Sequence, residues 1–93
     1  MTFLHAAALA LVVWYLMLPP IVNDQPDTTQ PLNTWDIWRS FDTATGCEEN
    51  RDFKAKQMRE TFKKNAVAAE KWATIFGVDS KCIGTDDPRL KDK

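Results

Sequence analysis

The chain is poor in the residues that most catalytic and metal sites require. Its 93 residues include one histidine, His5, two cysteines and three glycines. With a single histidine, most general acid–base schemes lose their usual proton carrier, and a structural zinc site lacks the four ligands it needs. The sequence also has no Cys-x-x-Cys pair and no glycine-rich loop to hold a phosphate. We therefore predict that the chain is not an enzyme and binds no metal or cofactor.

Blocks of like charge are also missing from the sequence. The 12 Lys and Arg residues nearly balance the 13 Asp and Glu residues, which leaves a net charge of −1. Because no basic block stands out, the electrostatic footprint of nucleic-acid binding is lacking. We therefore expect no nucleic-acid partner, and no motif predicts a small-molecule ligand.

Charged side chains are absent from residues 1–22, which are rich in Leu, Ala and Val. Residues 2–13 have the length of a signal-peptide core, although no basic residue precedes them and no clear cleavage site follows. Alternatively, residues 3–22 form an uncleaved membrane anchor about 30 Å long, which a proline pair shortens to residues 3–18. An ordinary buried helix is less typical of so apolar an N-terminus. In both leading interpretations the chain is exported, and an anchored chain would keep its C-terminus outside.

The rest of the chain divides by local pattern. Residues 23–33 contain turn-forming residues and no apolar period, which indicates a polar linker. Aromatic and polar side chains alternate over residues 34–41 and predict a half-buried strand. Residues 81–85 are a candidate further strand, and residues 86–93 form a polar tail. The predicted folded domain therefore covers residues 34–85.

A charged, amphipathic helical region lies between the two expected strands. Asp42, Thr43 and Thr45 are candidate N-caps, and Thr45 forms a potential capping box with Glu48. Gly77 is the expected C-terminal stop. An apolar stripe with helical spacing contains Ala55, Met58, Phe62, Ala66, Ala69, Ala73 and Phe76. The basic residues off this stripe, Arg51, Lys54, Lys56, Lys63 and Lys64, are expected to be solvated.

Two cysteines in an exported chain are expected to form one disulfide, here between Cys47 and Cys82. Such a bridge conflicts with one straight helix over residues 47–76, which would be about 43 Å long. The following residues return at most about 20 Å, whereas bridged Cα atoms lie within about 7 Å. A bridged chain therefore needs a helix break, which we place at residues 64–66 because Asn65 tolerates the left-handed conformation. An unbroken helix would instead mean that the cysteines do not pair with each other.

Three short blocks of this sequence are distinctive together: Trp14-Tyr-Leu-Met-Leu-Pro-Pro20, Ser40-Phe-Asp-Thr-Ala44 with Cys47, and Cys82-Ile-Gly-Thr-Asp-Asp-Pro-Arg-Leu90. They resemble a group of small, exported, uncharacterised bacterial proteins. The corresponding patterns in the group are W-Y-L-M-x-P-P, S-F-D-T-A-x-x-C and C-x-x-[ST]-D-D-P-R-L. The group has no established activity, so the resemblance implies a layout and no mechanism.

In that layout, residues 14–18 would be a first strand rather than the end of a membrane span. They would share one sheet with residues 34–41 and 81–85, with the helices on one face, and Cys47 would pair with Cys82. The expected fold class is therefore α+β. It combines a small two- or three-stranded sheet, a helix or helical hairpin on one face, one disulfide and an apolar N-terminal leader.

The only other cluster that suggests a site is Asp86-Asp-Pro-Arg89. Adjacent carboxylates rarely supply the six or more oxygen ligands that calcium needs, and they do not provide a separated acid and base. We expect instead that one Asp caps a turn, that Pro88 stiffens it, and that Arg89 pairs with a neighbouring carboxylate.

Together these features predict a small, non-enzymatic, disulfide-stapled module of the bacterial periplasm or cell envelope, with a binding or structural role. Trp35, Trp38 and Trp72 are candidate contacts for a protein partner wherever they stay exposed, although a small core is their expected place. The alternative is a single-span accessory subunit of a larger membrane complex. Residues 3–18 would then lie in the bilayer, and the helix could run unbroken along its partner.

Overall fold

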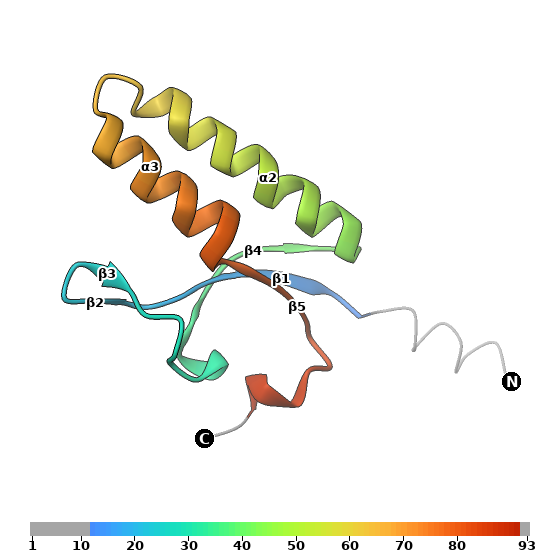
Figure 1. The fold of residues 1–93 in the computed structure, drawn as a ribbon. Coiled ribbons are helices and arrows are strands. Elements are labelled where there is room, and N and C mark those ends of the chain that lie inside the picture. Colours follow the sequence, from blue (N-terminus) through green and yellow to red (C-terminus); the bar gives the residue numbers. More distant parts are fainter. Residues whose placement is uncertain (1–11, 92–93) are drawn as a thin grey trace, which may run out of the picture.

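A three-stranded antiparallel sheet forms the centre of the computed structural model, which describes residues 12–91. Strand β1 (Trp14–Leu18) lies between β4 (Asp36–Phe41) and β5 (Lys81–Gly84), so the sheet order is β4-β1-β5 (Figure 1). The sheet thus unites the three segments that the resemblance implies, and the α+β class is confirmed. Among residues 12–91, only the central strand is paired on both sides, so β4 is an edge of the described sheet.

The last part of the apolar leader is a strand and not a membrane helix. Trp14–Leu18 pairs with β4 on one side and β5 on the other. Leu16 and Met17 point to opposite faces and are 0% and 2% exposed, because both faces of the sheet are covered. The helix expected over residues 3–18 is therefore wrong for these five residues, and residues 1–11 lie outside the described part. Nowhere in residues 12–91 is there a helix both long and apolar enough to cross a membrane.

The two faces of the sheet carry different layers. Helices α2 (Ala44–Thr61) and α3 (Ala66–Thr74) form a hairpin on one face (Figure 1). On the other face lie two short 3₁₀ helices, η1 (Leu32–Thr34) and η3 (Pro88–Leu90). A small core forms on this second side from Met17, Leu32, Trp35 and Ile83, with Tyr15 and Leu90 against it.

The break between the helices falls where the sequence places it, but for a different reason. Helix α2 ends at Thr61 and α3 begins at Ala66. Asn65 is extended, with φ −133°, and is the N-cap of α3: its side-chain oxygen accepts a hydrogen bond from the Ala68 N–H at 3.1 Å. The break is therefore made by a capping side chain and not by a left-handed residue.

At the start of α2, the sequence left three candidate caps. Thr43 is the N-cap, and its hydroxyl oxygen accepts a hydrogen bond from the Gly46 N–H at 3.0 Å. Thr45 lies within the helix, so the capping box predicted for Thr45 and Glu48 is wrong. The extended backbone of Thr43, which follows β4 almost directly, explains the earlier start.

Gly77 does not end a helix in the left-handed conformation. Helix α3 ends at Thr74 and passes into a π-helical turn, η2 (Ile75–Asp79), that contains Gly77. No described glycine has a positive φ. A Cβ atom on Gly77 would lie 3.1 Å from the Ala55 Cβ of α2. Glycine at position 77 therefore lets η2 approach α2 without this tight contact, and its prediction as a C-cap is wrong.

The linker predicted over residues 23–33 is more ordered than expected. Strands β2 (Ile21–Val22) and β3 (Gln25–Pro26) form a short hairpin. The two residues between them, Asn23 and Asp24, have φ of 53° and 67°. Positive φ at both positions is typical of the tight turns that suit hairpins, and Asn and Asp tolerate it better than most residues. Two-residue strands are too short to leave a periodic signal in the sequence.

Candidate functional site

The three tryptophans that the sequence suggests as contact residues differ in their exposure to solvent. Trp35 is 6% exposed in the small core, and its indole N–H donates to the Gln30 carbonyl oxygen at 2.9 Å. Trp72 on α3 is half-buried. Trp38 on β4 stays 45% exposed and is the strongest candidate for a contact residue.

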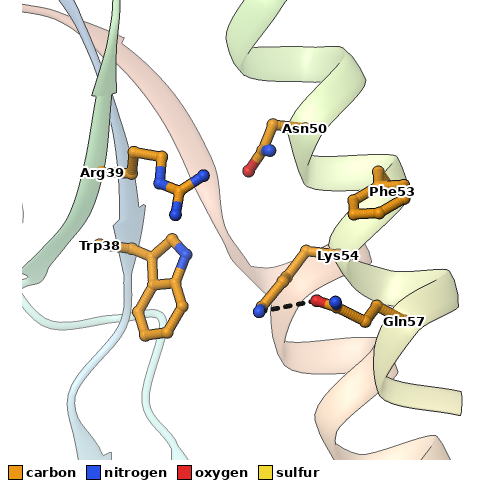
Figure 2. A pocket seen from close by; sticks show the side chains of 6 residues that line it. All are labelled: Trp38, Arg39, Asn50, Phe53, Lys54 and Gln57. Carbon is orange, nitrogen blue, oxygen red and sulfur yellow. Dashed lines mark hydrogen bonds between the residues drawn. The ribbon is translucent and has the colours of Figure 1, made fainter. Parts of the chain in front are cut away.

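A β-bulge sets the direction of Trp38. Arg39 and Ile37 of β4 pair with Leu16 and Met17, which are consecutive in β1, so Trp38 has no partner of its own. The extra residue breaks the alternation that the sequence predicts for this strand. As a result, Trp38 and Arg39 are neighbours in sequence and yet both point towards α2 (Figure 2).

Trp38 lies between two adjoining hollows on the helix-covered side of the sheet. The apolar hollow, about 340 Å³, is lined mainly by Leu18, Trp38, Met58, Phe62, Trp72 and Phe76. The cationic hollow, about 170 Å³, is lined by Trp38, Arg39, Asn50, Phe53, Lys54 and Gln57 (Figure 2). Trp38 and Lys54 line both hollows. Together the two form one feature, which we call the β4–α2 groove.

Lys54 is held at the junction of the two hollows by aromatic rings. Its ammonium group lies 5.2 Å from the centre of the Trp38 ring and 5.8 Å from that of Phe76, within the range of a cation–π interaction. The two rings pack edge to face, with centres 5.1 Å apart. The Lys54 Nζ also donates to the Gln57 Oε1 at 2.8 Å. Lys54 is therefore part of the groove, and its prediction as a solvated residue is wrong.

The charged side chains that line the groove are all basic. Its cations are Arg39 and Lys54, and neither hollow has an Asp or Glu in its lining. Among residues 12–91, no carboxylate lies within ion-pair distance of either cation. Two positive charges therefore lie beside an apolar surface without a carboxylate partner in the part of the chain that the structure describes.

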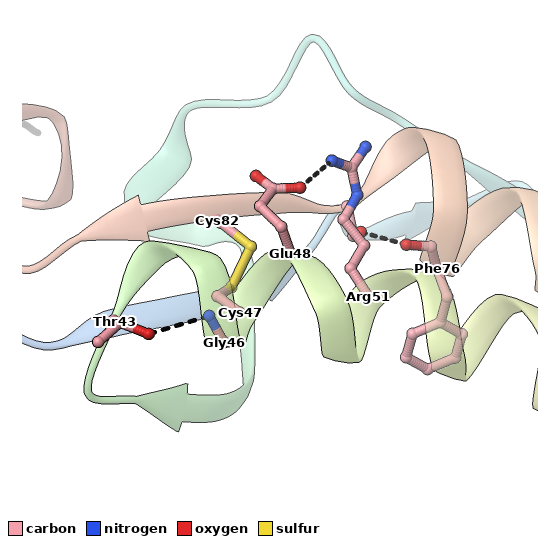
Figure 3. The surroundings of a disulfide bond; sticks show 8 residues. Thr43, Gly46, Cys47, Glu48, Arg51, Phe76 and Cys82 are labelled. Carbon is pink, nitrogen blue, oxygen red and sulfur yellow. Dashed lines mark hydrogen bonds and ion pairs between the residues drawn. A yellow bond between two sulfur atoms is a disulfide. The ribbon is translucent and has the colours of Figure 1, made fainter.

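The groove owes its shape to the way the helical hairpin is fixed at one end. The predicted disulfide is confirmed: it joins Cys47, in the first turn of α2, to Cys82 of β5 (Figure 3). The two Cα atoms are 6.1 Å apart, and Cys47 is fully buried. Next to it, Arg51 and Glu48 form an ion pair at 3.0 Å. The start of α2 is thus held on the sheet, while the connection to α3 lies farther from it (Figure 1).

The apolar stripe of the helical region divides between the interior and the groove. Ala55, Ala69, Ala73 and Phe76 are buried. Met58 and Phe62 are only half-buried and line the apolar hollow, and Ala66 is exposed. The sequence does contain a signal for the groove, because Lys54 precedes Met58 by four residues and so shares its helix face.

The acidic cluster near the C-terminus is a structural turn, as predicted. Asp87 caps η3, accepting from the Arg89 N–H at 2.9 Å and from the guanidinium at 3.1 and 2.7 Å. These bonds from Arg89 lower the pKa of Asp87, and the same contact raises the pKa of Arg89. Pro88 lies at the start of this short helix. Within residues 12–91, no three His, Cys, Asp or Glu side chains are grouped so as to hold a metal ion.

The chain was also compared with models of known protein families, with curated proteins and with solved structures, and no significant match was found. The case for a function therefore depends on the groove itself.

Proposed function

We propose that this chain is an exported, non-enzymatic binding module of the bacterial cell envelope, and that a protein partner contacts the β4–α2 groove. The observation that carries the proposal is the half-exposed Trp38, which a bulge turns towards an open apolar hollow. Bulges are common where a sheet directs a side chain to a functional site. Clustered aromatic surface beside polar groups is typical of protein interfaces.

Export is supported by the cysteine pair and by the leader. A disulfide such as Cys47–Cys82 persists in oxidising compartments and is rare in the cytosol. The uncharged run at the start of the sequence has the composition of a targeting segment. The resemblance to exported bacterial proteins agrees with both features.

Intact mass measurement tests the export part of the proposal. The protein is purified from its native host and alkylated without reduction, so that one spectrum reports both the leader and the free thiols. We expect no alkylation, because both cysteines are bridged. Two alkylated thiols would contradict an oxidising location.

Site-specific photo-crosslinking in the same host tests the binding part. A photoreactive residue replaces Trp38 in the groove or, as the control, Val78, which is 70% exposed and lines neither hollow. We expect one discrete cross-linked protein from position 38 in the envelope fraction and none from position 78. Equal products from both positions, or none from either, would overturn the proposal.

A further inference from the structure

The outer side of β4 gives the groove a feature that a simple apolar patch lacks. In the order β4-β1-β5, β4 is paired on one side only, so its outer backbone N–H and C=O groups have no strand partner among the described residues. Such an edge accepts an extended segment as an additional strand, with side-chain pockets beside it giving specificity. The β4–α2 groove places two hollows next to this edge.

We infer that the partner presents an extended acidic segment, which adds to the β4 edge and carries a large apolar residue and a carboxylate two positions apart. The inference rests on the proposed function and specifies its partner. In an extended chain, alternate side chains point the same way and lie about 6.6 Å apart. The two hollows adjoin through Trp38 and Lys54, so alternate side chains of one strand reach both.

The chemistry of each hollow selects its side chain. Leu18, Met58 and Phe62 give the apolar hollow a largely apolar lining, which suits a large apolar side chain of the partner. Arg39 and Lys54 give the other hollow two cations without a carboxylate partner in the described chain, which suits Asp or Glu. Asn50 and Gln57 add amide groups to that lining.

The same charges restrict which segments bind. A bulge and charged residues on an edge strand oppose indiscriminate strand pairing. A segment with Lys or Arg in the cationic hollow would bring like charges together without a counter-charge in the lining. Discrimination between acidic and basic segments is therefore the sharpest consequence of the inference.

Fluorescence anisotropy with synthetic peptides tests this consequence. The probe is a short labelled peptide of alternating Thr and Val in which a central Leu is followed two positions later by Asp. Two matched peptides carry Asn or Lys in place of the Asp. We expect the oxidised full chain to bind the Asp peptide at least tenfold more tightly than the Lys peptide, with the Asn peptide between them. Equal binding of all three would overturn the inference.

Protein variants show whether the groove makes the distinction. Arg39→Gln and Lys54→Gln are each expected to reduce the preference for Asp several-fold. Lys56→Gln is the control, because Lys56 is an exposed lysine of the same helix that lines neither hollow, and it should leave the preference unchanged. A preference that survives in both groove variants would show that the acidic residue binds elsewhere.

Two further measurements separate the remaining outcomes. Amide hydrogen exchange of β4 should slow when the Asp peptide binds, and protection limited to the helices would exclude strand addition. Vesicles of phosphatidylglycerol replace the peptide in a second assay, and binding to vesicles alone would identify a lipid surface and overturn the inference. If photo-crosslinking at position 38 succeeds while the peptides show no acid preference, only this inference fails and the proposed function stands.

Discussion

Removal of the Cys47–Cys82 disulfide should be the most damaging single change to this fold. The bridge joins residues 35 positions apart, and closing a loop of that length contributes about 3.8 kcal/mol in the chain-entropy account. The buried core of the described residues is small, with Leu16, Met17, Ile75 and Phe76 among its larger side chains, and a core this small rarely supplies more than about 3–5 kcal/mol. The bridge therefore provides roughly half of the expected stability.

Urea unfolding followed by the fluorescence of the four tryptophans measures this contribution. Oxidised protein is compared with the same protein in reductant, so that no buried atom is deleted. We expect the free energy of unfolding to fall by about 3–4 kcal/mol on reduction. The double variant Cys47→Ala/Cys82→Ala is the control, because reductant should not change its stability. A difference below about 1 kcal/mol between oxidised and reduced protein would refute the loop-closure reasoning.

Three smaller changes test the local arguments. Gly77→Ala should destabilise the fold by about 1–3 kcal/mol in urea unfolding, because its Cβ would meet Ala55 at 3.1 Å, and an equal loss in an Ala55→Gly background would contradict that contact as the cause. Asn65→Ala should cost about 1 kcal/mol by removing the cap of α3, and an unchanged midpoint would argue against the cap. Hydrogen bonds from Thr29 and Gln30 lower the pKa of the Asp27 carboxyl in the folded protein below its ordinary value of 3.8. The ionised carboxylate therefore stabilises the fold above pH 3.8, and this stabilisation is lost as the pH falls through the pKa of Asp27 in the folded protein. The stability advantage over Asp27→Asn should therefore shrink between pH 6 and pH 3, and an advantage that grows would show the opposite sign.

Parts of this fold were predictable because their signals are local or follow from distance alone. The bridge from Cys47 to Cys82 cannot coexist with one straight helix, and that conflict predicted a break, which the structure shows between Thr61 and Ala66. Its position at Asn65 was predicted from the residue type, although Asn65 acts as a cap and not as a left-handed residue. The turn at Asp87 was equally accessible, since its cap and its arginine are two residues apart. Neither conclusion needs knowledge of how the strands pair.

The features that the sequence did not reveal depend on contacts between distant segments. The bulge at Trp38 exists only in the pairing of β4 with β1, which lies more than a dozen residues earlier in the chain. Gly77 shows the same limit, because its role is set by Ala55 on another helix and not by its neighbours. The strand pattern and the C-cap rule each use the sequence of one segment alone. They therefore cannot predict the roles of Trp38 and Gly77, which depend on contacts with other segments.

The position of the disulfide explains why the β4–α2 groove forms. The disulfide holds the start of α2 on β5, at the edge of the sheet opposite β4. From this point the helical hairpin runs away from the strands (Figure 1). Met58 in the second half of α2 and Phe62, directly after the end of α2, stay half-buried. A sheet of three short strands leaves both side chains partly exposed, and they line the apolar hollow together with Trp38. Exposed apolar surface carries a risk of aggregation. Within residues 12–91 it lies beside two cations that have no carboxylate partner and a strand edge that has no strand partner, and this combination supports the proposal that a partner covers all three.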